Sequence, residues 1–129
     1  MFFIFVLMGT FLLVSIPQLK AENWSNWLGP NYNGSSENNT ISLPPEGKEF
    51  GIKWKIAVGS GWSAPIIHER SVYFHDQVGE NEIVHRLNID NGAEIWQHSY
   101  FSGYQDSFGM GNGPRSTPSI SSGLIATHG

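Results

Sequence analysis

The chain contains no cysteine, and this absence excludes several kinds of site. Without thiols, these 129 residues can form no disulfide, no thiolate metal site and no cysteine nucleophile, and they lack the lipid-modified cysteine of a bacterial lipoprotein. Charge is also scarce, because 7 basic and 11 acidic side chains leave a formal net charge of −4. No basic cluster exists, so the electrostatic footprint of a nucleic-acid partner is missing, and we expect no such partner.

Motifs with a recognisable metal or catalytic spacing are missing as well. The histidines are scattered, without the spacing of a helical zinc site. They are His68, His75, His85, His98 and His128. Asp90-Asn91-Gly92 has the start of a calcium loop, but further acidic ligands at regular spacing do not follow it. No nucleophile elbow, P-loop or dinucleotide fingerprint occurs, so we predict no catalytic residue and no metal site within this chain.

The longest hydrophobic run lies at the N-terminus. Residues 1–16 are almost wholly apolar, Pro17 ends the run, and Lys20-Ala21-Glu22 follows. Such a core followed by a small residue is typical of a secretory signal peptide, and a membrane-spanning helix needs about 20 apolar residues. We therefore predict a signal peptide over 1–21 and a periplasmic or secreted protein with no stable membrane span after cleavage. An uncleaved N-terminal anchor is the alternative.

The segment 22–50 is rich in Asn, Ser and Gly, and it ends soon after Pro44-Pro45. This composition buries little apolar surface. We therefore expect an irregular backbone that is pinned by Trp24, Trp27 and Tyr32.

After residue 50 the pattern is that of an all-β protein. Ile52–Val58 alternates apolar residues with Lys53 and Lys55, which is typical of a half-buried strand. Four further strands are expected over Ala64–His68, Ser71–Asp76, Glu82–Ile89 and Glu94–Tyr100. Asn91-Gly92, between the last two, predicts a tight type I′ turn with positive φ at both residues.

An internal repeat accompanies these strands. Ser63-Ala64-Pro65-Ile66-Ile67 and Val72–His75 align without gaps on residues 116–120 and 125–128 at a constant offset of 53 residues. A repeat of roughly 40–50 residues that holds about four short strands is the signature of a β-propeller blade.

The run Arg86–Trp96 resembles the blade ending of the pyrroloquinoline-quinone-type (PQQ-like) β-propeller repeats, Ala-Leu-Asp-x-x-Thr-Gly-x-x-x-Trp. Leu87, Gly92 and Trp96 agree with this pattern, and Arg86, Asn88 and Asn91 stand where it usually has Ala, Asp and Thr. Trp24–Pro30 and Gly113–Pro118 also resemble parts of secreted bacterial propellers of this type.

This resemblance implies a partial propeller over 51–129, with a closing strand, a first blade and the start of a second. In it, Ile52–Val58 completes the last blade of the ring, and Tyr73 and Trp96 fill the space between neighbouring blades. A ring needs at least four blades, so we expect the chain to be the N-terminal fragment of a longer protein. A complete small β protein is the alternative.

The repeat also selects the residues of a candidate site. Trp62 and Arg115 occupy equivalent positions at the offset of 53, just before the Ser-x-Pro that opens each inner strand. A stacking indole and a bidentate donor at the mouth of a central channel suit an anionic or planar ligand. Alternatively, Trp62 packs on a neighbouring blade and Arg115 satisfies loop carbonyls. The glycine-rich loop 102–115 crosses one face of the disc, where binding usually resides.

Three functions are compatible with this sequence. The first, which we favour, is an exported, non-enzymatic binding or assembly scaffold with a protein, small-molecule or saccharide ligand at the propeller face. The second is a quinoprotein dehydrogenase of alcohols or sugars, in which PQQ and Ca²⁺ would bind to the full-length protein and not to this fragment alone. The third is a carbohydrate- or polymer-handling propeller with catalytic residues further along. One propeller fold hosts many functions, so the fold alone does not choose among them.

Overall fold

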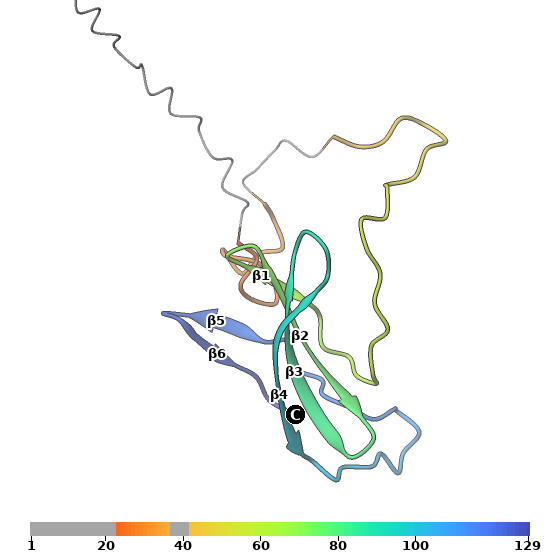
Figure 1. The fold of residues 1–129 in the computed structure, drawn as a ribbon, viewed down its shortest axis with the longest axis vertical. Helices are drawn as coiled ribbons and strands as arrows, with labels where there is room; N and C mark the ends of the chain where they lie inside the picture. The colour runs from red at the N-terminus through yellow and green to blue at the C-terminus, as the bar shows by residue number, and fades with distance from the viewer. Residues whose placement is uncertain (1–22, 37–41) are drawn as a thin grey trace, which may run out of the picture.

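The computed structural model describes residues 23–36 and 42–129, and the predicted signal peptide lies outside the described residues. The fold over these residues is all-β (Figure 1). Strands β1 (Ile66–His68), β2 (Ser71–Val78), β3 (Asn81–Asn88) and β4 (Glu94–Phe101) form an antiparallel sheet in chain order. Strands β5 (Ser119–Ser121) and β6 (Leu124–Ala126) form a separate hairpin. The described residues contain no helix that is long and apolar enough to cross a bilayer.

The four strands expected between residues 64 and 100 are confirmed, with shifted ends. The first begins at Ile66 and not at Ala64, after a proline that has no N–H to donate to a ladder. The second and fourth run slightly further than expected, to Val78 and Phe101. Their alternating side chains give the sheet two distinct faces.

The offset of 53 residues reappears in the register of the two hairpins. Ile66 pairs with Tyr73 and His68 with Ser71, while Ser119 pairs with Ala126 and Ser121 with Leu124. Each hairpin turns through two residues with positive φ. These are Glu69 (45°) and Arg70 (59°) in the first, and Ser122 (51°) and Gly123 (75°) in the second. The type I′ geometry that suits two-residue hairpins thus occurs at equivalent places in both.

The prediction of a type I′ turn at Asn91-Gly92 is wrong. Only Gly92 has positive φ (70°), and the loop is longer, with the Gly92 N–H donating to the Asn88 carbonyl at 2.9 Å. Two side-chain amides favour this longer loop, because Asn88 accepts from the Asp90 N–H and Asn91 accepts from the Ala93 N–H. The indole N–H of Trp54 also donates to the Ile89 carbonyl at 2.8 Å.

The expected strand Ile52–Val58 is not a strand among the described residues. It forms part of a long arm beside the four-stranded sheet, and the nearest ladder contact is a single bridge between Ser60 and Gln77 (Figure 1). A strand requires a partner with unpaired backbone groups, and the arm reaches such groups only at Ser60, which exchanges two backbone hydrogen bonds with Gln77 where β1 leaves the edge of β2 open. Ile52 is 83% exposed as a result.

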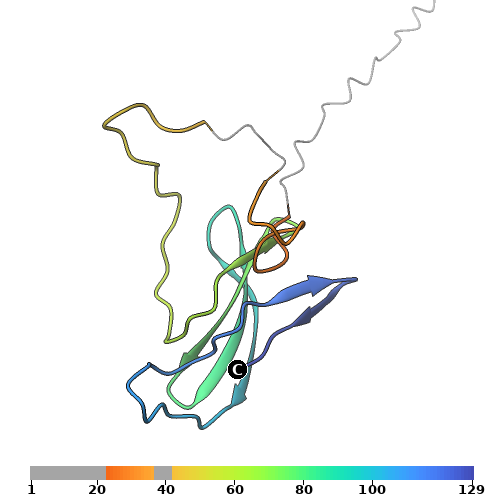
Figure 2. The same ribbon diagram turned by 180° about the vertical axis from the view of Figure 1, so that it is seen from behind.

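The core lies between the four-stranded sheet and the β5–β6 hairpin. Ile66, Tyr73 and Ile120 are buried there, and Trp96 and Ile125 pack against them. The rings of Tyr73 and Trp96 meet edge to face with centroids 6.3 Å apart. Figures 1 and 2 show the hairpin and the 42–65 arm on opposite sides of the sheet.

The N-terminal segment joins the two hairpins. Trp24 exchanges two backbone hydrogen bonds with Ile67, of 2.7 and 2.9 Å, and the Ile120 N–H donates to the Ser25 carbonyl at 3.0 Å. Ile67 and Ile120 are equivalent in the repeat. Trp24 therefore pins this segment as expected, but Trp27 and Tyr32 do not, because they are 62% and 68% exposed.

Replacing Ile66 by Ala removes three carbons from the fully buried centre of the core. We expect Ile66→Ala to lower the free energy of unfolding by about 2–5 kcal/mol, as measured by urea denaturation. Leu43→Ala is the matched control, since Leu43 is 77% exposed and its loss is expected to change stability by about 0.5 kcal/mol or less. Equal losses in the two variants would contradict the placement of the core.

Candidate binding site at the loop end of the sheet

The structure brings together the two residues that the repeat singled out. The backbone N–H of Trp62 donates to the Pro114 carbonyl at 2.8 Å, so the leads into the two hairpins lie side by side. Gly113 has a φ of 92° and lies so close to the Ser60 carbonyl that a Cβ there would collide with it. Because residues 60 and 113 are also 53 apart, equivalent positions of the two repeats meet at this end of the sheet.

Loop 102–115 crosses the same end, and Asp106 organises it. One oxygen of Asp106 accepts the Phe108 N–H at 3.2 Å, and the other accepts the Gly111 N–H at 2.8 Å. Desolvation raises the pKa of Asp106, but the backbone N–H groups of Phe108, Gly111 and Met110, with the Arg115 charge, outweigh it and lower that pKa below its ordinary value. The carboxylate is therefore ionised and holds the loop in shape.

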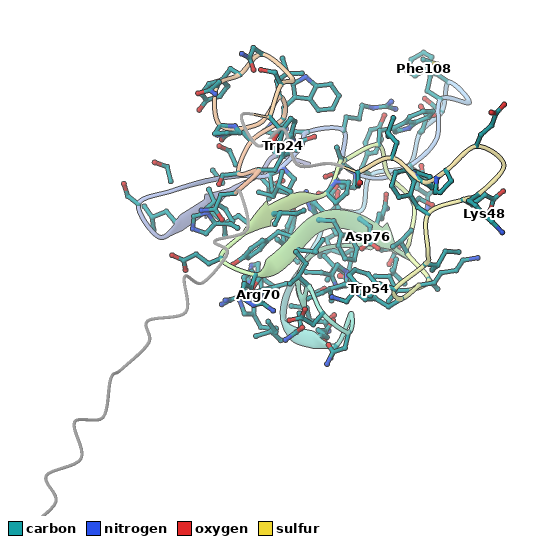
Figure 3. All side chains as sticks on the ribbon, turned by 90° about the horizontal axis from the view of Figure 1, so that it is seen from above. Trp24, Lys48, Trp54, Arg70, Asp76 and Phe108 are labelled. Atoms are coloured by element: carbon teal, nitrogen blue, oxygen red, sulfur yellow. The ribbon has the colours of Figure 1, made fainter. Side chains whose placement is uncertain are left out.

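Arg115 and Trp62 both meet this loop at Gly111. The Arg115 guanidinium donates from Nη2 to the Gly111 carbonyl at 3.2 Å. A Cβ at Gly111 would lie 3.6 Å from the indole nitrogen of Trp62. The Trp62 side chain is 65% exposed among the described residues, which include no neighbouring blade on which it could pack. The Arg115 bond to Gly111 is a contact with a loop carbonyl, as the alternative interpretation expects. Figure 3 shows Phe108 at the tip of the loop, far from Arg70.

A cavity of about 490 Å³ opens beside Arg115. Its volume falls within the range of small-molecule sites. The side chains that line it are Glu82, Ser102, Tyr104, Arg115, Ser116 and His128. Trp62 is outside this lining, and its indole nitrogen lies next to Gly111, which also accepts the Arg115 hydrogen bond. Among the described residues, the guanidinium uses one of its five donors in a hydrogen bond, and the others remain for a ligand.

The inner wall of the cavity is a buried polar network that sequence reasoning missed. Glu82, only 2% exposed, accepts from the Tyr100 hydroxyl at 2.5 Å and from the Ser102 hydroxyl at 3.1 Å. His75 lies 3.4 Å from the same carboxylate, and its other nitrogen is 2.9 Å from the Thr127 hydroxyl. The network thus links β2, β3 and β4 to the residue that follows β6.

Burial controls the protonation of this network. Desolvation lowers the pKa of His75 below its ordinary value of 6.5, although the Glu82 and Asp76 carboxylates act in the opposite direction. Desolvation and the hydrogen bond to Glu82 raise the pKa of Tyr100 to about 12. At neutral pH the imidazole is therefore neutral, and the phenol keeps the proton that it donates to Glu82.

The carboxylates of the sheet do not fit a calcium site. Asp76 accepts the Gly59 N–H at 2.7 Å and pairs with His85 at 3.0 Å, so both of its oxygens are engaged. Both oxygens of Glu82 are engaged in the same way. Within residues 23–36 and 42–129, no group of three or more acidic, histidine or cysteine side chains has the arrangement of a metal site. The described residues therefore supply no free oxygen cluster for Ca²⁺.

Comparison with known proteins finds no family model, no curated protein and no solved structure that matches the chain. The interpretation of the site accordingly depends on its own geometry.

Gly113→Ala tests whether the two segments that precede the hairpins must lie side by side at Ser60 and Gly113. The new Cβ would meet both a positive φ and the Ser60 carbonyl. Gly47→Ala is the matched control, because Gly47 has a φ of 76° but open space around it. We expect Gly47→Ala to cost about 1–2 kcal/mol of unfolding free energy and Gly113→Ala about 1–3 kcal/mol more. Equal costs in urea denaturation would show that the close contact with Ser60 is absent.

The depressed pKa of His75 predicts a pH-dependent stability. The unfolded chain binds more protons than the folded chain when the pH lies below 6.5 and above the folded pKa. Neutral His75 therefore contributes fully to the free energy of unfolding above pH 6.5. This contribution is lost as the pH falls through the folded pKa, and the free energy of unfolding decreases by at most about 1.4 kcal/mol per pH unit. His75→Gln should flatten a stability profile measured between about pH 5 and 8. His98→Gln, at an exposed position, is the matched substitution for the comparison of the two profiles.

Proposed function

We propose that the chain supplies repeats to an exported PQQ-like β-propeller that acts as a non-enzymatic binding scaffold. The observation that carries this proposal is the offset of 53 residues, which holds in the sequence, in the register of the two hairpins and in the position of both positive-φ turns. A four-stranded antiparallel meander followed by a hairpin stacked on its face is what two successive blades require.

The arm over 52–58 supports ring closure. Residues 52–58 have no strand partner among the described residues. The arm covers an apolar cavity of about 290 Å³ on the face of the sheet opposite the β5–β6 hairpin, lined in part by Trp54, Ile56, Val58 and Phe74. A strand of another blade would pair with the arm and bury these side chains, which removes an exposed edge of the kind that promotes aggregation.

The buried ionisable groups support a scaffold over an enzyme. Glu82 and His75 are held by each other and by Tyr100, Ser102 and Thr127. They join the sheet to the second hairpin and are therefore committed to structure. The exposed groups at the loop end, Arg115 and Trp62, are suited to binding.

Ring closure is tested in the intact protein at two exposed residues of the arm, one apolar and one charged. Ile52→Asp would place a charge where another blade should pack, and we expect it to lower the free energy of unfolding by about 2 kcal/mol or more. Lys55→Asp exchanges one charge for another at an exposed residue of the same arm and should change stability by about 0.5 kcal/mol or less. If both changes are equally small in urea denaturation, the arm is not covered and the closing role is wrong.

The choice between scaffold and quinoprotein dehydrogenase is tested by adding PQQ and Ca²⁺ to the intact protein. A scaffold should leave the absorbance of the free quinone unchanged and should not reduce an artificial electron acceptor when alcohols or sugars are supplied. Saturable quinone binding together with substrate-dependent reduction of the acceptor would contradict the proposal and establish the dehydrogenase.

A further inference from the structure

We propose that the cavity beside Arg115 binds a small acidic saccharide, with the guanidinium holding its carboxylate and the Trp62 indole stacking on its ring. This inference rests on the scaffold function proposed above and names its ligand class. It requires an oriented cation, an exposed aromatic face next to it and a polar cavity of the right size.

The cation is oriented before any ligand arrives. Asp106 fixes Gly111 through its N–H, and the Gly111 carbonyl accepts one donor of Arg115. The backbone of the residue preceding Arg115 is held in turn by the Trp62 N–H. No ion pair within 4.0 Å is formed by Arg115 among the described residues, so its charge is not neutralised by direct contact. A planar guanidinium in this state can bind a carboxylate through two parallel hydrogen bonds.

The surroundings favour a sugar ring over a simple inorganic anion. The exposed indole of Trp62 and the Arg115 guanidinium both lie next to Gly111, and Tyr104, 48% exposed, lines the cavity. The aliphatic face of a pyranose packs well on such rings, while its hydroxyl groups can pair with the hydroxyls of Ser102, Tyr104 and Ser116. The volume of about 490 Å³ is sufficient for one or two sugar units.

The charge balance favours a singly charged ligand over a polyanion. Arg115 is the one arginine or lysine in the lining of the cavity, and the buried carboxylate of Glu82 lies in the same wall. The whole chain carries a net charge of −4, which repels a polyanion at long range. A ligand with a single carboxylate on an otherwise neutral ring matches the single cation of the cavity and is repelled little by the net negative charge of the chain.

The test compares galacturonic acid with galactose, which differ only at C6, where galacturonic acid carries a carboxylate. Binding to the intact protein would be measured by calorimetry and by quenching of tryptophan fluorescence. We expect galacturonic acid to bind at least about tenfold more tightly than galactose, since a charge-assisted hydrogen bond separates the two. Arg115→Gln should abolish this preference without changing the melting temperature, and Trp62→Ala should weaken both sugars.

The matched control is Arg70→Gln, which removes an arginine outside the lining of the cavity, in the β1–β2 turn, where Arg70 pairs with Asp90. It should leave the preference for galacturonic acid intact. Equal affinity for the two sugars, or a preference that survives Arg115→Gln, would overturn the inference. Tighter binding of hexaglutamate than of galacturonic acid would also overturn it, in favour of an acidic peptide partner.

These results are separable from the tests of the scaffold itself. The stability of the Ile52→Asp variant reports on ring closure, and the titration with PQQ and Ca²⁺ reports on catalysis. Neither measurement depends on Arg115. Loss of saccharide binding with an intact response at Ile52 would reject the ligand class alone.

Discussion

The packing of the β5–β6 hairpin on the four-stranded sheet is the contact on which the rest of the structure depends. A two-stranded hairpin of three-residue strands is not stable by itself in water. It is held because Ile120 enters the same core as Ile66 and Tyr73. Loop 102–115 spans from β4 toward the start of this hairpin, so the position of Arg115 follows from where the hairpin packs.

The contact between the hairpin and the sheet is apolar at one end and hydrogen-bonded at the other. Near the Glu69–Arg70 turn it is apolar and aromatic, with Tyr73 and Trp96 edge to face. Toward the loop end it becomes the hydrogen-bonded network of His75 and Glu82 with Tyr100 and Thr127. Apolar packing supplies most of the attraction, whereas a buried polar network must be satisfied in full and so accepts one register only. The two ends together define how the hairpin sits.

The N-terminal segment stabilises both hairpins through its backbone, which its composition does not predict. A stretch rich in Asn, Ser and Gly gives little reason to expect a structural role beyond its aromatic residues. Trp24 and Ser25 nevertheless form backbone hydrogen bonds to Ile67 and Ile120, which are equivalent residues of the two hairpins. The segment thus covers otherwise free backbone groups on both hairpins, as sheets require of their edges. Its other aromatic residues, Trp27 and Tyr32, stay in solvent because the turn that carries them leads away from the core.

The sequence alone determined that four strands lie between residues 64 and 100, the offset of 53 and the equivalence of Trp62 with Arg115, because alternation and repetition are local properties of the chain. Only the tertiary structure decided that Asn91-Gly92 belongs to a longer loop, that 52–58 has no strand partner among the described residues and that Glu82 is buried. Each of these depends on which side chains supply hydrogen bonds in the folded chain. Trp54 and the Asn side chains reshape the turn, and Tyr100 and Ser102 permit the burial of a carboxylate that by itself favours water.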